Sequence, residues 1–168
     1  MKSGIKVALA AAASLAAVMA ATGSAHAQQI SRSHVIMYNS QRNTCLRTDG
    51  PREVTLGSCG DAAAQWNIIP DDGYNEIQNV ATGTCLEHYN QAGGIFPVLG
   101  ETYLMSCAGN PRVLWDADFV YNNVFLFQNH EDPSICLDSG QQNPASSGFW
   151  LEFNDCHLNN AYQQWELA

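Results

Sequence analysis

The stretch from residue 135 to residue 168 decides the fold of this chain. It contains three marks, I-C-L-D-S-G at 135–140, F-W-L-E-F-N-D-C at 149–156 and Y-Q-Q-W-E-L at 162–167. Cys136 and Cys156 enclose a loop and a short alternating strand, and the pair Gln164-Trp165 follows them. The same marks occur twice earlier in the chain, which predicts an architecture built from three internal repeats.

The earlier copies keep a nearly constant register. The first unit reads V-I-M-Y-N, T-C-L-R-T-D-G and A-Q-W-N-I-I, and the second reads Y-N-E-I-Q-N, T-C-L-E-H-Y and V-L-W-D-A-D-F. The spacing is 49 and 50 residues between the closing tryptophans, and 48 and 49 between the second cysteines of the units: Trp66, Trp115 and Trp165; Cys59, Cys107 and Cys156. The repeats run over about 34–72, 73–120 and 121–168.

Each unit consists of short apolar runs separated by Gly, Asn, Asp and Pro, without a sustained helical period. Val54 and Leu56 alternate with outward-pointing residues, as do Leu151 and Phe153. This pattern predicts an all-β chain with roughly four short strands per unit. Because no unit of this size buries a face alone, the three must share one core, and a closed threefold barrel leaves few exposed strand edges.

The first 27 residues have the pattern of a cleaved signal peptide. Lys2 and Lys6 precede an apolar run, and Ala25-His26-Ala27 supplies small residues at the cleavage site. The run is short for a membrane anchor. The expected mature chain, 28–168, has no lysine and carries five arginines against sixteen acidic residues. We therefore expect a secreted protein, extracellular or periplasmic, that neither binds nucleic acid nor inserts into a membrane.

These repeats resemble the ricin B-type lectin domain, a β-trefoil with three Q-x-W repeats. The resemblance rests on the Cys-Leu-Asp opening, the second cysteine after an alternating strand and the Gln-Trp closing, and it covers residues 34–168. Two departures concern the motif: Gln65-Trp66 lacks the intervening residue, and no glutamine lies near Trp115. The resemblance implies a single trefoil domain over 28–168 and a non-catalytic, carbohydrate-binding function.

An even cysteine count in an exported chain predicts disulfides, and six cysteines allow fifteen pairings. Together with the repeat, the resemblance implies one disulfide within each unit, and the alternative is cross-linking between units. The implied pairs are Cys45–Cys59, Cys85–Cys107 and Cys136–Cys156.

The resemblance also implies one shallow sugar pocket per unit, and the third unit fits best. Asp138 stands two residues after the first cysteine, where a carboxylate accepts hydrogen bonds from sugar hydroxyls. Glu152 and Asn154 occupy the strand positions, and Gln163 stands two before Trp165. The usual aromatic platform is replaced by Asn154, and Trp150 has the parity to take its place. The alternative reading of Asp138-Ser139-Gly140 is a turn bonded to its own backbone.

The other two units match the pocket pattern less well. In the second, Glu87 replaces the aspartate and Tyr103 offers an aromatic ring, which predicts a weaker pocket. In the first, Arg47, Gly57 and Ala64 occupy the pocket positions, which predicts no sugar site.

Several other residues are assigned to the scaffold. The three closing tryptophans are expected in the core because of their threefold placement. The acidic pairs at 71–72 and 116/118 lack the ligand run of a calcium loop, so no metal and no cofactor are expected. No motif of an enzyme is present, and we expect no catalysis.

Two functions follow as hypotheses. The first is a secreted lectin that recognises galactose-type or related glycans through the third unit. The second is a cell-binding or protein-interaction subunit of a multi-chain secreted toxin, with degenerate sugar pockets and a protein partner.

Overall fold

The computed structural model of the chain describes residues 28–89, 101–107, 110–140 and 152–168. The expected signal peptide, residues 1–27, lies outside them. Within the described ranges the secondary structure consists of β-strands and three short 3-10 helices, without an α-helix. The twelve strands are β1 Arg32–Asn39, β2 Thr44–Thr48, β3 Val54–Gly57, β4 Gln65–Asp71, β5 Tyr74–Asn79, β6 Cys85–Tyr89, β7 Glu101–Met105, β8 Leu114–Tyr121, β9 Val124–Asn129, β10 Ile135–Asp138, β11 Glu152–Asp155 and β12 Trp165–Leu167.

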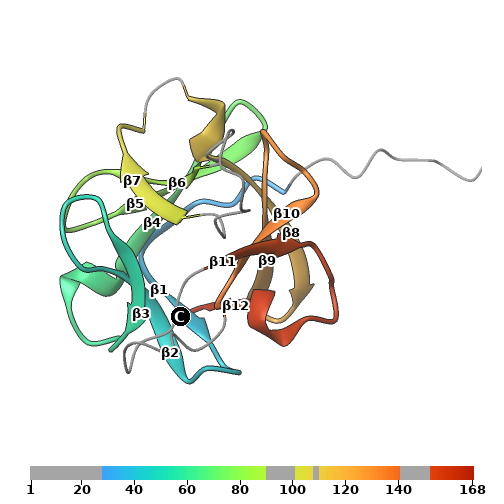
Figure 1. Cartoon of the computed structure of the whole chain (residues 1–168), viewed down its shortest axis with the longest axis horizontal. Helices are drawn as coiled ribbons and strands as arrows, with labels where there is room; N and C mark the ends of the chain where they lie inside the picture. Colours follow the sequence, from blue (N-terminus) through green and yellow to red (C-terminus); the bar gives the residue numbers. More distant parts are fainter. Residues whose placement is uncertain (1–27, 90–100, 108–109, 141–151) are drawn as a thin grey trace, which may run out of the picture.

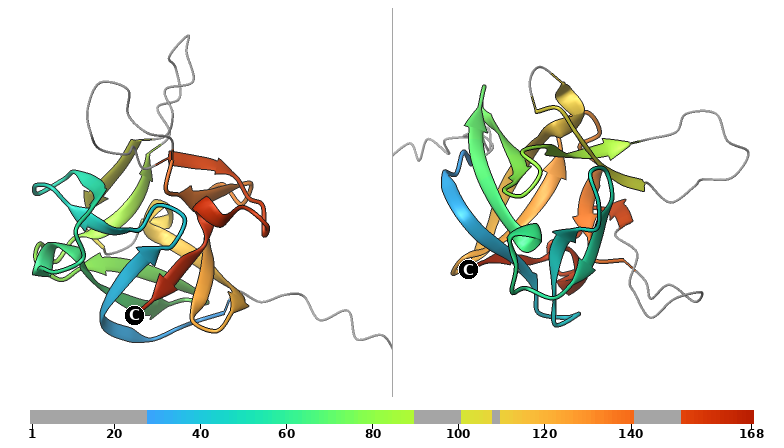
Figure 2. Two further views of the ribbon diagram at one scale, coloured as in Figure 1. Left: turned by 90° about the horizontal axis from the view of Figure 1, so that it is seen from below. Right: turned by 90° about the vertical axis from the view of Figure 1, so that its left-hand side faces the viewer.

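Six of the strands close into an antiparallel barrel (Figure 1). Hydrogen-bonded neighbours run β1-β4-β5-β8-β9-β12, and β12 pairs with β1 to close the ring. The closing register joins Met37 to Leu167 and Tyr38 to Glu166. Figure 2 shows the N-terminal and C-terminal strands side by side, in blue and red. Closure removes the open edges that a flat sheet of these strands would expose.

The other six strands form three hairpins, one per unit. The hairpins β2–β3, β6–β7 and β10–β11 pair with the barrel strands β1, β5 and β9, respectively. Each unit therefore contributes two barrel strands and one hairpin. This arrangement confirms the predicted all-β trefoil with four strands per unit.

One disulfide ties each hairpin together, as the repeat and the resemblance implied. The bonds are Cys45–Cys59, Cys85–Cys107 and Cys136–Cys156, and no cysteine is free. All three pairs lie within a unit, so the alternative of cross-links between units is wrong. A framework of this kind forms and persists in an oxidising compartment.

The core is built around the three closing tryptophans, all fully buried. Each indole N–H donates to the main-chain carbonyl of the leucine that follows the first cysteine of its unit. The three bonds are Trp66 to Leu46 at 2.9 Å, Trp115 to Leu86 at 3.1 Å and Trp165 to Leu137 at 3.0 Å. The prediction that these tryptophans are scaffold is confirmed, and the bond explains why Cys-Leu and Trp recur together.

A second threefold set consists of buried asparagines that end the first strand of each unit: Asn39, Asn79 and Asn129. The amide of Asn79 donates to the carbonyls of Ala63 and Gln65 in the preceding unit. Its oxygen accepts from the backbone N–H of Ala81 and Thr82. One side chain thus fixes a turn in its own unit and the backbone before the tryptophan of the preceding one. Asn39 and Asn129 repeat this bridge.

Among the described residues no helix is long and apolar enough to cross a membrane.

Candidate functional site

Each unit places one charged residue two positions after its first cysteine, on the first strand of its hairpin. These equivalent residues are Arg47, Glu87 and Asp138. Each lies near a 3-10 helix that precedes the closing tryptophan: η1 Ala62–Ala64, η2 Pro111–Val113 and η3 Ala161–Gln163. The residue before each helix is polar, namely Asp61, Asn110 and Asn160. The charged position and this cap residue define the candidate site of each unit.

In the third unit, the Asp138 carboxylate is held by two donors. Its Oδ1 accepts from the Gly140 backbone N–H at 2.8 Å, and its Oδ2 accepts from the Asn160 amide at 3.1 Å. Asn160 also caps η3, because its oxygen accepts from the Tyr162 N–H. Asp138 is therefore both a turn former, as one reading of the sequence held, and an oriented acceptor. Each carboxylate oxygen keeps a lone pair beyond these bonds.

The first unit contributes an arginine to this third site. The Arg42 guanidinium donates to the Gly140 carbonyl and lies over the Tyr162 ring, with Cζ 4.4 Å from the ring centroid. The Ser139 N–H donates to the Tyr162 carbonyl at 2.8 Å. The segment after Asp138 is thus fixed from two sides, by η3 and by the loop after β1.

Gln163 is fully buried and faces the hairpin backbone. Its Nε2 donates to the Asp155 carbonyl at 2.8 Å, and its Oε1 accepts from the His157 N–H at 2.8 Å. These contacts connect η3 to the end of β11. The structure therefore gives Gln163 a supporting position behind the site.

The strand residues expected in the third pocket are placed only through the backbone register. Glu152 lies opposite Asp138, and Asn154 lies opposite Cys136 on the paired strands β10 and β11. The hairpin thus brings the Glu152 backbone next to Asp138. Trp150 lies outside the described residues.

In the second unit, Glu87 is neutralised by a neighbouring arginine. Arg112, in η2, lies 3.8 Å from the Glu87 carboxylate and 3.0 Å from that of Glu131. Burial raises the pKa of Glu87, the positive charge of Arg112 opposes this shift, and Glu131 adds to it. The backbone of Tyr103 lies opposite Glu87 in the register. The carboxylate of this unit therefore already has a cationic partner.

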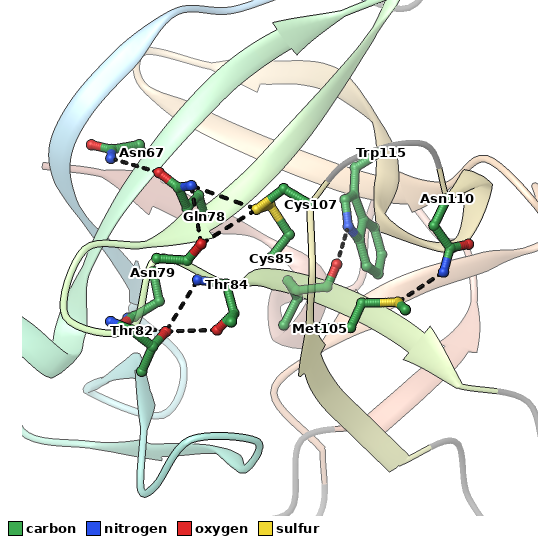
Figure 3. Close-up of a disulfide and its surroundings, with 12 residues drawn as sticks. Asn67, Gln78, Asn79, Thr82, Thr84, Cys85, Met105, Cys107, Asn110 and Trp115 are labelled. Carbon is green, nitrogen blue, oxygen red and sulfur yellow. Dashed lines mark hydrogen bonds between the residues drawn. A yellow bond between two sulfur atoms is a disulfide. The ribbon is translucent and has the colours of Figure 1, made fainter.

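His88, next to Glu87, is 2% exposed. Its pKa is lowered mainly by burial, although Asp132 and Glu131 pull the pKa up and Arg112 pushes it further down. The cap residue of this unit also differs from Asn160 in its contact. The Asn110 amide donates to the Met105 sulfur at 2.8 Å, as Figure 3 shows beside the buried Trp115. Among the described residues, no contact joins Glu87 to Asn110 as Asp138 is joined to Asn160 in the third site.

In the first unit the polarity of the pair is reversed. Arg47 forms an ion pair with Asp61 at 3.2 Å and donates to the Ser58 hydroxyl at 2.8 Å. A Cβ on Gly57 would lie 2.7 Å from the Arg47 Cδ, so the arginine stem covers the strand where a platform would stand. The Arg47 side chain therefore lies where the sugar pocket of this unit would be expected.

One group in the described part of the chain has metal-ligating atoms close together, namely Glu76, Cys85 and Cys107. Its two sulfurs are joined in the disulfide of the second unit, so they are not thiolates that could bind a metal. The burial of Glu76 and the charge of Asp71 raise the pKa of Glu76.

The cap residues were missed in the sequence, although a signal was present. Asp61, Asn110 and Asn160 each stand five residues before a closing tryptophan. Alignment of the units on tryptophan would have shown a column of Asp, Asn and Asn, which are the preferred cap residues. Arg42 had no such signal, because its contact with Gly140 joins two different units.

The closed six-stranded barrel, the three hairpins and the threefold core define a β-trefoil with one candidate site per unit. A family model for the ricin-type β-trefoil lectin domain matches residues 36–165. The chain belongs to this family, and it is a carbohydrate-binding module by class. A comparison with curated protein sequences finds no match.

Solved structures agree on the fold. The designed threefold-symmetric protein ThreeFoil is 15% identical with a TM-score of 0.64, over 80% of this chain and 97% of that one. A ricin B-like lectin from Macrolepiota procera, in complex with lactose, is 13% identical with a TM-score of 0.64, over 83% and 97%. A mosquitocidal holotoxin is 22% identical with a TM-score of 0.66, over 82% of this chain and 17% of the holotoxin. At these identities the likeness shows the fold.

Proposed function

We propose that this chain is a secreted, non-catalytic lectin that binds a galactose-type or related glycan at the third unit. The observation that carries the proposal is the state of the three equivalent charges. Arg47 is paired with Asp61, and Glu87 lies beside Arg112, but no ion pair to Asp138 is formed within the described ranges. Among the three described sites, Asp138 is therefore the carboxylate that is oriented by hydrogen bonds and forms no ion pair.

The orientation of Asp138 matters because ordering a side chain on binding reduces the free energy of binding, which is small at a shallow site. Gly140 and Asn160 already hold the two oxygens in place, so a sugar hydroxyl meets a fixed acceptor. Asp138 is 3% exposed, so a sugar reaches only the edge of the carboxylate. In such a dry site a charge-assisted hydrogen bond is stronger than in water.

Neighbouring groups support the proposal. The Ser139 hydroxyl is buried and has no hydrogen-bond partner among the described residues, whereas buried polar groups are usually paired. A ligand or a bridging water at Asp138 would supply the missing partner. Gln163 acts in the proposal as a support that holds η3 and the hairpin together. Glu152, Asn154 and Trp150 remain proposed sugar contacts, and Glu87 with Tyr103 remains a weaker second pocket.

A glycan array with lactose and related galactosides tests the site. Asp138→Asn keeps the size of the side chain and removes its charge, and it should lower affinity at least tenfold. The matched control is Asp72→Asn, which removes the same charge at an exposed turn with φ 41°, a conformation that asparagine tolerates. Equal binding by wild type and Asp138→Asn would reject the third-unit site.

The holotoxin likeness favours a second function, a cell-binding or protein-interaction subunit of a multi-chain secreted toxin. The paired charges at Arg47 and Glu87 agree with this function, since they leave two units without an open carboxylate. A blank glycan array together with a stable partner chain after co-purification would support the subunit. Galactoside binding by the isolated chain would support the lectin.

A further inference from the structure

A hollow of about 180 Å³ lies where the third unit meets the first on the outside of the barrel. Its lining includes Tyr38, Ser40, Tyr121, Asn123, Val124 and Glu166. None of the residues that contact Asp138 belongs to this lining. The hollow is therefore separate from the site of the proposed function.

Four of the lining residues form one row across four neighbouring strands. Tyr38 on β1 lies opposite Glu166 on β12, Glu166 lies opposite Val124 on β9, and Val124 lies opposite Tyr121 on β8. Directly opposite residues of antiparallel strands project from the same face. Glu166 and Val124 thus form the floor, and a tyrosine stands on each side.

The hollow exists because two small residues replace two rings. Val124 opens β9 as Tyr74 opens β5, and Ser40 follows Asn39 as His130 follows Asn129. Where the second unit meets the third, the Tyr74 and His130 rings are in contact, with centroids 3.8 Å apart. An isopropyl group and a hydroxymethyl group cannot fill the same space. The junction of units three and one is therefore open where its counterpart is packed.

The position of Glu166 has a different contact at the junction of units one and two. There Asn67, which follows Trp66 as Glu166 follows Trp165, donates to the Gln78 amide oxygen at 3.3 Å. The side chain of Glu166 forms no hydrogen bond or ion pair with any residue in the described ranges. The carboxylate of Glu166 is thus an unused acceptor on the floor of the hollow.

The chemistry of the lining selects the class of ligand. It contains a carboxylate, amides and hydroxyls but no lysine or arginine, so an anion finds no partner. Tyr121 is half-exposed and offers a ring face, on which the apolar side of a sugar packs. The hollow is small, about 180 Å³, which favours a ligand of one ring over a longer chain. We propose that this hollow is a second carbohydrate site for a single neutral sugar ring, with Glu166 as hydroxyl acceptor and Tyr121 as platform.

Amide chemical shifts test this site on the whole chain. Wild-type protein is titrated separately with galactose, glucose, mannose, N-acetylglucosamine and choline, and backbone amides of 121–124 and 164–167 are followed. At least one sugar should shift these amides with saturation, and Asp138→Asn should leave this response unchanged. Val124→Tyr, which places the Tyr74 side chain at the equivalent position, should weaken the response at least tenfold. Glu166→Gln and Tyr121→Ala, both at exposed positions, should each weaken it several-fold.

The outcomes separate the two sites. The second site is overturned if no sugar shifts these amides, if the shifts persist unchanged in Glu166→Gln and Tyr121→Ala, or if only choline produces them. If the sugar-induced shifts of the amides of 138–140 and 160–163 are the same in Asp138→Asn as in wild type, that result counts against the proposed function alone. Should Val124→Tyr not fold, the two exposed variants decide the question.

Discussion

Asp138 and Asn160 are joined side chain to side chain, with the Asn160 amide 3.1 Å from Asp138 Oδ2. The first unit keeps the same relationship between Arg47 and Asp61, at 3.2 Å, but with acid and donor exchanged. The first and third units thus keep a contact between the second residue after the cysteine and the cap before the tryptophan, whereas in the second unit Glu87 lies beside Arg112 and Asn110 donates to Met105. In the third unit this contact orients an acceptor.

Asn160→Ala should weaken both stability and glycan binding. The variant removes the cap of η3, at about 1 kcal/mol, and releases one oxygen of Asp138. We expect a several-fold lower affinity for lactose by calorimetry and a lower free energy of unfolding in urea. Asn110→Ala is the matched control, because Asn110 caps η2 in the same way without contacting a carboxylate. Its stability should fall similarly, and an equal fall in affinity would contradict the role of Asn160.

The buried asparagines should be the most costly polar residues to truncate. Asn39→Ala would leave the carbonyls of Ala161, Tyr162 and Gln164 and the Arg42 N–H without this partner. A buried group without a partner costs about 1–3 kcal/mol, so we expect a loss of about 3 kcal/mol in urea unfolding. The exposed Asn159→Ala should stay within about 0.5 kcal/mol. Similar values for the two variants would contradict the bridging role.

The asparagines show where sequence reasoning ended. The repeat register predicted the short strands and the buried tryptophans and, together with the resemblance, the disulfide within each unit, because each depends on residues within one unit. Asn39 contacts residues more than 120 positions away, and its role follows only from the closure of the barrel. The same limit applies to the site. The resemblance named Asp138 as a candidate through its position after Cys136, whereas the direction of the Gln163 side chain depends on how η3 meets β11.

His88 should make the fold sensitive to mild acid. Since burial lowers its pKa, the unfolded chain binds a proton at a higher pH than the folded chain does. The stability due to His88 is present above its ordinary pKa, near 6.5, and is lost as pH falls below it. His88→Thr, which copies Thr48 of the first unit, should remove this slope, at most about 1.4 kcal/mol per pH unit.

The measurement is urea unfolding of both proteins between pH 5 and pH 8. Glu87 acts in the opposite sense, because its raised pKa costs stability as pH rises above the ordinary glutamate value. That contribution is nearly common to both proteins, so the difference between their curves isolates His88. A difference that does not change with pH would contradict the prediction.

The three disulfides should contribute similar stability but different function. Replacing Cys136 and Cys156 by serine opens a loop closed over 20 residues, and replacing Cys45 and Cys59 opens one closed over 14. Each loss should be about 3 kcal/mol in the chain-entropy model. Only the Cys136–Cys156 bond ties the hairpin whose strand β10 ends at Asp138. Only its removal should therefore lower lactose affinity under conditions where both variants remain folded. Equal affinity losses would place the sugar elsewhere.

Arg42 should support the third site from outside its unit. Arg42→Met keeps the apolar stem but removes the bond to Gly140 and the charge over the Tyr162 ring. The cation–π contact alone is worth about 0.5–1 kcal/mol at an exposed position, and the freed Gly140 also loosens the donor to Asp138. We expect a several-fold lower affinity, mostly through faster dissociation. Arg52→Met, at an exposed arginine without a side-chain partner in the described ranges, is the control. If both variants bind alike, the contact of Arg42 with Gly140 and Tyr162 has a structural role only, and Asn160 and the turn hold the Asp138 carboxylate without the first unit.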